Sequence, residues 1–370
     1  MLSAVMLAGI VQFPTVFAAG INVNGRTLNL DVNADQSVDV TDLSAVRQGL
    51  VGNNSSNIDV NCDNQQDVKD LIALKKFFGE TYGKNNQYSV TDKYLSEGDG
   101  VMTREVNLEA GLGNKSLQIC FLSDTHYKSS SDDGNLTKML EFADNYDQIV
   151  LGGDMVEHYG VLQQYVDKAK AYQGKIMMTL GSHEAMKYSG TSTEEERYAK
   201  IHSIWPHDEN YYSKVLENKV MLIQINNGRG KFLDEQTEQF ASDLSLAKSR
   251  GYKIVLFMHE PLYVADSAQS KVTPLYLSPQ RTDLFDYYCV RGVNFNNYQG
   301  KNAQGATKDI YEMITQNADT IQGIFCGHLH ADFYTEITAK NADGSSAKIP
   351  QYNVCSSNSD HGHAIIIRIR

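Results

Sequence analysis

Residues Leu117–His126 have the sequence LQICFLSDTH, a largely apolar run of six residues followed by a short polar segment. A run of this length with β-branched and aromatic members predicts a buried β-strand. Asp124 and His126 follow it, and on an extended backbone two side chains two residues apart project to the same side. A carboxylate and an imidazole placed together at a strand end predict a shared metal ion.

The same arrangement recurs four more times along the chain. A short apolar run precedes donor residues in each case: QIVLGG before Asp154, IMMTL before Ser182 and His183, IVLFM before His259, and GIFC before His328 and His330. Segments with apolar residues every three or four positions lie between the runs and predict helices, at 136–143 and 240–247. Alternating strands and helices predict a layered α/β domain with its active site beyond the carboxyl ends of the strands.

The donor types indicate the chemistry of that site. Carboxylate and imidazole ligands together suit Fe, Zn or Mn, and the two oxygens of Asp154 allow it to bridge two such ions. Two ions roughly 3.5–4 Å apart can activate a water molecule and hold the attacking and leaving oxygens of a phosphoryl transfer. No GxSxG nucleophile motif is visible, so water is the expected nucleophile.

Taken in order, the five segments resemble the calcineurin-like metallophosphoesterases, whose pattern is DxH, GD, GNH[ED], H and GHxH. The resemblance covers roughly residues 115–335 and implies a layered β-sandwich flanked by helices. It implies a first metal bound by Asp124, His126, Asp154 and His330. A second metal would be bound by Asp154, His259 and His328, with Ser182 as a weak ligand. His183 would be catalytic, either protonating the leaving group or stabilising the transition state.

Ser182 is the main departure from the family pattern, because the family has an asparagine ligand there. A hydroxyl is a shorter and poorer donor than an amide carbonyl, so the second metal is expected to bind weakly at this corner. The alternative function is therefore a scaffold-docked binding protein whose phosphoesterase domain is catalytically impaired. The segment GDMVEH also resembles a GDxVDR version of the second motif, and on that match Glu157 would orient His183. His361 and His363 are expected in a surface turn, with a place lining the site as the alternative.

The overall composition excludes some classes of function. The 370 residues carry 45 acidic and 33 basic side chains, a formal net charge of −12, which disfavours a nucleic-acid binder and a polybasic membrane-surface protein. Between Asp31 and Asp70 there are eight aspartates but only two basic residues, a net charge of −6 and half of the total excess. The position of that charge is therefore informative.

The acidic segment contains two copies of one pattern, 28 residues apart. Oxygen donors at alternate positions allow a tightly turned loop to surround one hard cation, and calcium accepts six to eight such ligands. The expected ligands are Asp31, Asn33, Asp35, Ser37 and Asp42 in the first loop, and Asp59, Asn61, Asp63, Gln65 and Asp70 in the second. A helical pattern follows each loop, whereas the segment before the first loop, INVNGRTLNL, does not predict a helix.

Two loop–helix units without entering helices resemble a dockerin, a small all-α module that binds two Ca²⁺ and docks secreted enzymes onto cohesin-bearing scaffolds. The resemblance implies a cohesin-binding surface formed by Val40, Thr41, Arg47, Gln48, Val68, Lys69, Lys75 and Lys76. The glycine usual at loop position 6 is replaced by Gln36 and Asn64, and glutamine tolerates the left-handed conformation poorly. A calcium-stabilised spacer without a cohesin partner is the alternative.

The chain is expected to have four parts. Residues 1–19 are apolar with small residues near Ala18 and predict a signal peptide, followed by the dockerin-like module (21–80), a polar linker (81–90) and the metallophosphoesterase domain (91–370). The expected location is secreted, extracellular or at the cell surface through a scaffold, as in a cellulosome, with no membrane span after signal cleavage. The expected function is metal-dependent hydrolysis of phosphomonoesters or phosphodiesters by metal-activated water.

Overall fold

The fold is taken from a computed structural model of the chain. The structure describes residues 21–23, 26–34, 40–50, 58–74, 88–91, 101–110, 115–187, 190, 192–264, 276–277, 304–357 and 362–370. Among these residues, none of the helices has both the length and the hydropathy needed to cross a lipid bilayer. The expected signal peptide lies outside the described residues.

The N-terminal region contains a short hairpin and two helices. β1 (Ile21–Val23) pairs antiparallel with β2 (Arg26–Leu28), and helix α1 (Val40–Leu50) follows the first acidic loop. A second helix, over residues 68–74, follows the second acidic loop. Leu30, Val46 and Leu74 are among the buried residues of this region. The expected loop–helix duplication is therefore accompanied by a hairpin, so helices are not its only elements.

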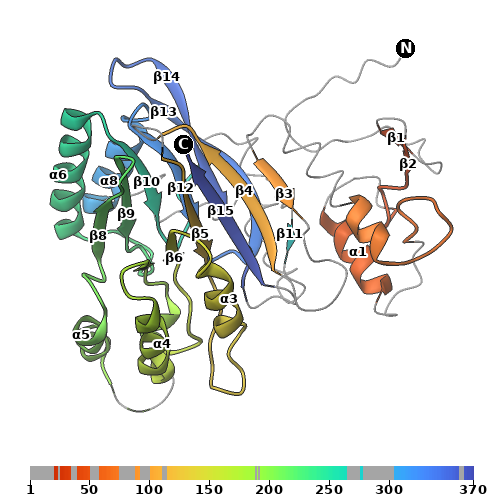
Figure 1. Cartoon of the computed structure of the whole chain (residues 1–370), viewed down its shortest axis with the longest axis horizontal. Coiled ribbons are helices and arrows are strands. Elements are labelled where there is room, and N and C mark those ends of the chain that lie inside the picture. The colour runs from red at the N-terminus through yellow and green to blue at the C-terminus, as the bar shows by residue number, and fades with distance from the viewer. Residues whose placement is uncertain are drawn as a thin grey trace.

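Two sheets form the body of the molecule (Figure 1). The six-stranded sheet has the order β3 (Tyr88–Thr91), β4 (Met102–Leu108), β15 (His363–Ile369), β5 (Leu117–Leu122), β6 (Gln148–Leu151) and β7 (Ile176–Met178). The seven-stranded sheet has the order β11 (Tyr276–Leu277), β13 (Ala331–Lys340), β14 (Ser346–Asn353), β12 (Ile321–Cys326), β10 (Lys253–Phe257), β9 (Val220–Ile225) and β8 (Tyr211–Val215). Because β3 begins at Tyr88, the last residues of the expected linker (81–90) lie in a strand.

The core between the sheets is aromatic. The ring centroids of Phe121 from β5 and Phe257 from β10 lie 5.7 Å apart, and Phe325 from β12 stacks on Tyr352 from β14 at 4.9 Å. All four side chains are buried, and they join one sheet to the other. Aromatic pairs at such separations contribute roughly 0.5–1.5 kcal/mol beyond the apolar area they bury.

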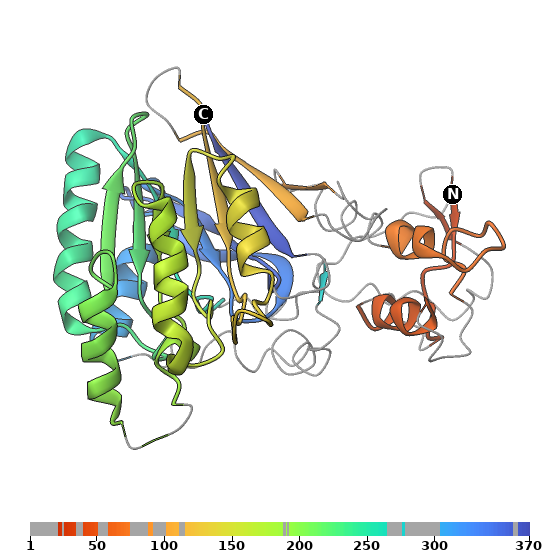
Figure 2. The same ribbon diagram turned by 60° about the horizontal axis from the view of Figure 1, so that its bottom comes forward.

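Helices cover the outer faces of both sheets (Figures 1 and 2). The six-stranded sheet packs against α3 (Leu136–Ala143), α4 (Leu162–Ala169) and α5 (Glu194–Ile204). The seven-stranded sheet packs against α6 (Asp234–Arg250) and α8 (Gly305–Thr315). Short 3₁₀ turns are η1 (Tyr159–Val161), η2 (Lys170–Tyr172) and η3 (His183–Ala185). This confirms the expected layered α/β sandwich flanked by helices.

The directions of the strands bring the donor residues together at the carboxyl ends of the sheets. β5, β6 and β7 run parallel to one another, as do β9, β10 and β12 in the other sheet. The carboxyl ends of parallel strands lie at the same edge of a sheet, and ligands bind beyond that edge. The residues that follow β5, β6, β7, β10 and β12 are the five donor segments identified in the sequence.

Candidate metal centre

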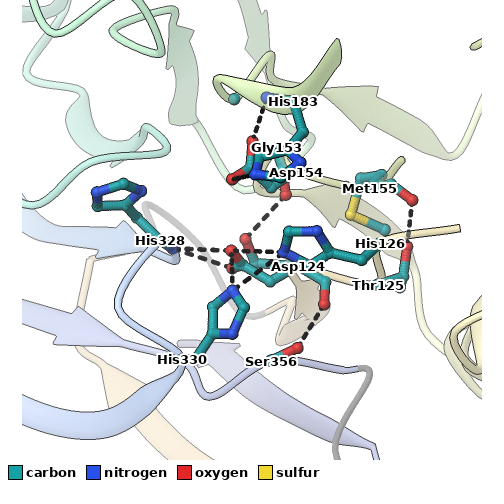
Figure 3. A network of polar contacts seen from close by, with 12 residues as sticks. Asp124, Thr125, His126, Gly153, Asp154, Met155, His183, His328, His330 and Ser356 are labelled. Carbon is teal, nitrogen blue, oxygen red and sulfur yellow. Dashed lines mark hydrogen bonds and ion pairs between the residues drawn. The ribbon is translucent and has the colours of Figure 1, made fainter. Parts of the chain in front are cut away.

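The first group of donor atoms joins the loop after β5 to the loop after β12. The Nε2 atoms of His126 and His330 face each other at 3.0 Å, and His330 Nε2 lies 3.2 Å from Asp124 Oδ1 (Figure 3). All three side chains are buried. Two facing ring nitrogens beside a carboxylate need a proton or a cation between them, so this donor set fits a transition-metal ion.

The second group lies beside the first and joins β6, β10 and β12. His259 Nε2 lies 3.1 Å from Asp154 Oδ2 and 3.2 Å from His328 Nδ1. His259 Nδ1 donates to the main-chain oxygen of Gly152 at 2.8 Å, which leaves Nε2 directed toward Asp154. Asp154, His259 and His328 place one donor atom each within 4.8 Å of one another, as Asp124, His126 and His330 do. The first triplet holds three of the four residues expected for the first metal, without Asp154, and the second holds the three expected for the second metal apart from the weak ligand Ser182.

A main-chain hydrogen bond connects the two donor groups. The main-chain N–H of His328 donates to Asp124 Oδ2 at 3.0 Å, so a residue of the second group holds a carboxylate of the first. The charge of Asp154 acts to raise the pKa of both Asp124 and His126, beside the larger effects of burial and of their hydrogen-bond partners. Asp154 is a member of the second donor group, and its role as a bridge between two metals stays a prediction.

The backbone at these residues differs from the extended conformation expected from the sequence. Asp124, His126, Asp154, His328 and His330 have φ of 58°, 49°, 48°, 70° and 50°, respectively. They make up five of the ten non-glycine residues with positive φ among the described residues. The extended-strand reasoning for the Asp124–His126 and His328–His330 pairs is thus wrong. Left-handed conformations of non-glycine residues cluster at functional sites.

Ser182 and His183 follow β7 and face Asp154. The Ser182 hydroxyl lies 3.4 Å from each oxygen of Asp154. This distance is at the upper limit for a hydrogen bond. The main-chain N–H of His183 donates to Asp154 Oδ1 at 2.8 Å, and its ring Nε2 lies 4.0 Å from Asp154 Oδ2. The His183 ring packs edge-on against His126, with centroids 4.6 Å apart.

Glu157 contacts two histidines of the site, His126 and His183, in different ways. Its carboxylate Oε2 lies 3.0 Å from His126 Nδ1, whereas its main-chain oxygen accepts a hydrogen bond from His183 Nδ1 at 2.7 Å. The expected orientation of His183 is therefore made by the main chain, and the carboxylate orients His126. A carboxylate on the distal nitrogen of a ligand imidazole fixes its tautomer and raises its basicity. His158 caps η1, since its Nδ1 accepts from Gly160 N.

Burial and neighbouring charges set the protonation of these groups. Burial opposes ionisation of Asp124, yet His330 and His259 hold its pKa at about 2. Burial likewise opposes the charged form of His259, but Asp154 raises the pKa of that imidazole to about 10. Burial and the adjacent His259 lower the pKa of His328 to about 4. Ionised carboxylates and a neutral His328 are ready to bind a cation, and His259 must release a proton to do so.

Two supporting residues were missed in the sequence. The buried Glu184 carboxylate accepts main-chain hydrogen bonds from Asp154 (3.1 Å), Met155 (2.7 Å) and Gly181 (2.7 Å). It therefore holds the loop after β6 against the loop after β7. Its place within the GSHE segment was the available signal.

Asn227 is the second supporting residue and follows β9, a sixth strand end at the site. Its Oδ1 accepts from the main-chain N–H groups of His259 (3.1 Å) and Glu260 (2.9 Å), and its Nδ2 donates to Glu260 O at 2.8 Å. The apolar run VMLIQI before Asn226 and Asn227 repeats the pattern of the other five segments and could have revealed it.

The expected calcium ligands are described only in part. Asp35 and Ser37 lie outside the described residues. Asp42 Oδ1 accepts from the main-chain N–H groups of Val32 and Asn33, and Asp70 Oδ1 accepts from Val60 and Asn61 in the same way. The remaining expected ligands are half-buried or exposed: Asp31, Asn33, Asp59, Asn61, Asp63 and Gln65.

The two acidic loops also share an unusual backbone feature. Ala34 and Cys62, at equivalent positions 28 residues apart, have φ of 59° and 56°. Asn64, where a glycine is usual, has the expected left-handed conformation with φ 63°. The loops, whose expected ligands include amide and hydroxyl oxygens, add no further group of three close His, Cys, Asp or Glu donors within the described residues.

The expected cohesin-binding residues are split in the same manner. Gln48, Val68 and Lys69 are exposed and Arg47 is half-buried. Val68, with 41% of its surface exposed, is one of four large apolar side chains that stand out on the described surface. The side chains of Val40, Thr41, Lys75 and Lys76 lie outside the described residues.

Comparison with known families identifies the domain. A sequence profile of the calcineurin-like phosphoesterases matches residues 117–332. The chain belongs to this family. It is therefore a hydrolase that acts on phosphoric ester bonds, and the family usually binds two divalent metals, for which the donor groups described above are suited. The match confirms the family expected from the five motifs.

Several solved structures resemble this calcineurin-like phosphoesterase. A dimetal phosphatase from Danio rerio has 10% identity and a TM-score of 0.40, over 67% of this chain and 90% of that one. The purple acid phosphatase PPD1 from yellow lupin (Lupinus luteus) has 11% identity and a TM-score of 0.38, over 69% and 44%. The phosphopantetheinyl hydrolase of Mycobacterium tuberculosis has 13% identity and a TM-score of 0.34, over 67% and 91%. None of the curated proteins compared with the chain matches it.

Proposed function

We propose that this chain hydrolyses phosphomonoesters or phosphodiesters with two divalent transition metals, held by the two donor groups. The observation that carries the proposal is the convergence of five strand ends from two sheets on two neighbouring donor groups. Asp124, His126 and His330 would hold one ion, and His259 and His328 the other, with Asp154 between them. When bound, the ions activate water and neutralise charge on the phosphoryl group.

The chain's own residues would position the reacting groups. The main-chain N–H of His183 and the ring of His259 fix the two oxygens of Asp154, so this carboxylate cannot rotate freely. The His183 ring is fixed through its Nδ1 proton, and one fifth of its side-chain surface is exposed. Its Nε2 is therefore available to give a proton to a leaving-group oxygen or to bind a phosphoryl oxygen.

The test uses the full chain and two matched carboxamide variants. Asp154→Asn should lower the hydrolysis of an aryl phosphate by roughly 100-fold or more and reduce bound Mn²⁺, because one ligand loses its charge. Asp144→Asn changes an exposed carboxylate that pairs with Lys175, and it should behave like the parent. A screen of monoesters, diesters and nucleotides then defines the substrate class. A parent chain with no bound metal and no hydrolysis would overturn the proposal.

We also propose that residues 21–80 form a calcium-dependent dockerin-like module that attaches the enzyme to a cohesin-bearing scaffold outside the cell. The repeated hydrogen bonds of Asp42 and Asp70 and the matched left-handed Ala34 and Cys62 support an internal duplication. Exposed Val68 beside exposed Lys69 supports a docking surface. Calorimetric titration with a panel of cohesin modules, with Ca²⁺ and with EGTA, tests it. Binding to no cohesin would favour the spacer alternative.

A further inference from the structure

Cys355 and Ser356 follow the segment matched by the family profile, yet they contact both loops of the first donor group. The Ser356 hydroxyl donates to the main-chain oxygen of Asp124 at 2.5 Å (Figure 3). Cys355 Sγ lies 3.0 Å from the main-chain oxygen of His330. The two contacts bring one short loop against two predicted ligands that are 206 positions apart in the chain.

The buried carboxylate of Asp332 holds the loop that contains Cys355 and Ser356. Asp332 Oδ1 accepts from the main-chain N–H of Cys355 at 2.8 Å, and Asp332 Oδ2 accepts from His363 Nδ1 at 2.8 Å. Arg104 Nε lies 3.4 Å from Asp332 Oδ1. All of these side chains are buried, and His363 is 1% exposed, so its expected place in a surface turn is wrong. His361 lies outside the described residues.

The buried cluster joins four parts of the fold. Arg104 comes from β4, Asp332 from β13, His363 from β15, and Cys355 from the loop after β14. Buried charge-assisted hydrogen bonds are short and directional. Removal of one partner leaves a buried charge without compensation, which is destabilising. The position of Cys355 and Ser356 therefore depends on Asp332 and on the imidazole that fixes it.

We propose that Asp332 and His363 are positioning residues for the first metal, acting through Cys355 and Ser356 on His330 and Asp124. The inference rests on the proposed two-metal function. It extends the functional unit to the C-terminal strand β15, beyond the residues that carry the family motifs. Outer partners of metal ligands typically contribute 10–100-fold to metal affinity, which sets the size of the expected effect.

The experiment measures Mn²⁺ binding to the metal-free full chain by calorimetry, alongside its melting temperature. His363→Leu should weaken one of the two Mn²⁺ sites by about 10–100-fold. His363→Asn, whose Nδ2–H can replace the donated proton, should restore affinity to within about threefold of the parent. Ser356→Ala, which removes the hydroxyl that contacts Asp124, should weaken the same site by about tenfold and keep the fold.

Ile367→Ala is the matched control, because Ile367 is a buried residue of the same strand that packs between the sheets. It should lower the melting temperature while Mn²⁺ affinity stays as in the parent. If His363→Leu and Ser356→Ala both bind Mn²⁺ like the parent, or if His363→Asn restores nothing, the positioning role is overturned. A parent that binds no Mn²⁺ would instead overturn the proposed function itself.

Discussion

Ser182 is the residue at which this site departs most clearly from the family pattern. Its hydroxyl lies 3.4 Å from each oxygen of Asp154, so it reaches the bridging carboxylate only at the limit of hydrogen bonding. An asparagine at this position would extend one bond further and present a carbonyl oxygen, a stronger ligand for a divalent cation. The expected weak binding of the second metal is therefore a prediction that concerns one side chain.

Ser182→Asn should strengthen the second metal and raise kcat/KM for an aryl phosphate, by roughly tenfold or more, because a second ion adds a charge that stabilises the transition state. Elemental analysis and steady-state kinetics at fixed Mn²⁺ measure the effect. Ser249→Asn, on the exposed side of α6, serves as the control. Hydrolysis by neither the parent nor Ser182→Asn would favour the impaired binding protein.

Substitution of the buried Glu184 should lower the stability of the fold. Its carboxylate accepts three main-chain N–H groups, and Glu184→Gln would turn an NH₂ group toward at least one of them. We expect a loss of about 1–3 kcal/mol in the free energy of unfolding, measured with urea on the metal-free chain. Glu141→Gln, on the exposed side of α3, should cost little. An unchanged stability of Glu184→Gln would mean that the two loops are held together by other contacts.

At the scale of elements, β7 is an edge strand that depends on a histidine. The Nε2 atom of His207 accepts the main-chain N–H of Met178 at 3.1 Å, and its Nδ1 donates to Asp208 O at 3.0 Å. Burial lowers the pKa of His207, against the smaller opposing effect of the Asp208 main chain. The neutral imidazole is thus the form that stabilises the strand which leads to Ser182 and His183.

The sign of the pH effect follows from that lowered pKa. The unfolded chain binds a proton on His207 near pH 6.5, whereas the folded chain does so only at lower pH. The stabilisation is therefore complete above that pH and is lost as the pH falls through the folded pKa. His207→Gln, whose side-chain oxygen can accept from Met178 N, should lose less stability than the parent between pH 7.5 and 5. Equal losses in urea unfolding would contradict this.

The sequence predicted the strands and the convergence of their ends, because short apolar runs and the residues after them are local features. It did not predict the backbone of Asp124 or His330, since an i, i+2 pair fits an extended strand and a left-handed turn equally well. It misplaced His363, whose burial depends on β15 pairing with β4 and β5, far away in the chain. Glu157 does contact His183 as expected, but through its main-chain oxygen, and a side-chain pattern in the sequence does not reveal such a contact.

At the scale of the whole molecule, the acidic charge serves two kinds of predicted metal chemistry. Added Ca²⁺ should stabilise the N-terminal region alone, by about 2.7 kcal/mol at a concentration 100-fold above its Kd. Calorimetry of the Mn²⁺-loaded chain should show one transition that rises with Ca²⁺ and a second that does not. Asp59→Ala, which removes a ligand of the second loop only, should reduce the rise, and Mg²⁺ at equal concentration controls for ionic strength. A single transition indifferent to Ca²⁺ would overturn the calcium sites.

The left-handed backbone at Asp124, His126, Asp154, His328 and His330 has a consequence for how this enzyme can change over generations. Each such conformation costs a non-glycine residue roughly 1–2 kcal/mol. Glycine at these positions would relieve the cost and delete a ligand at the same time. Substitutions that remove a ligand would then increase the stability of the fold. Selection for stability alone would therefore favour the loss of the site. A lineage keeps all five residues only while hydrolysis itself contributes to fitness.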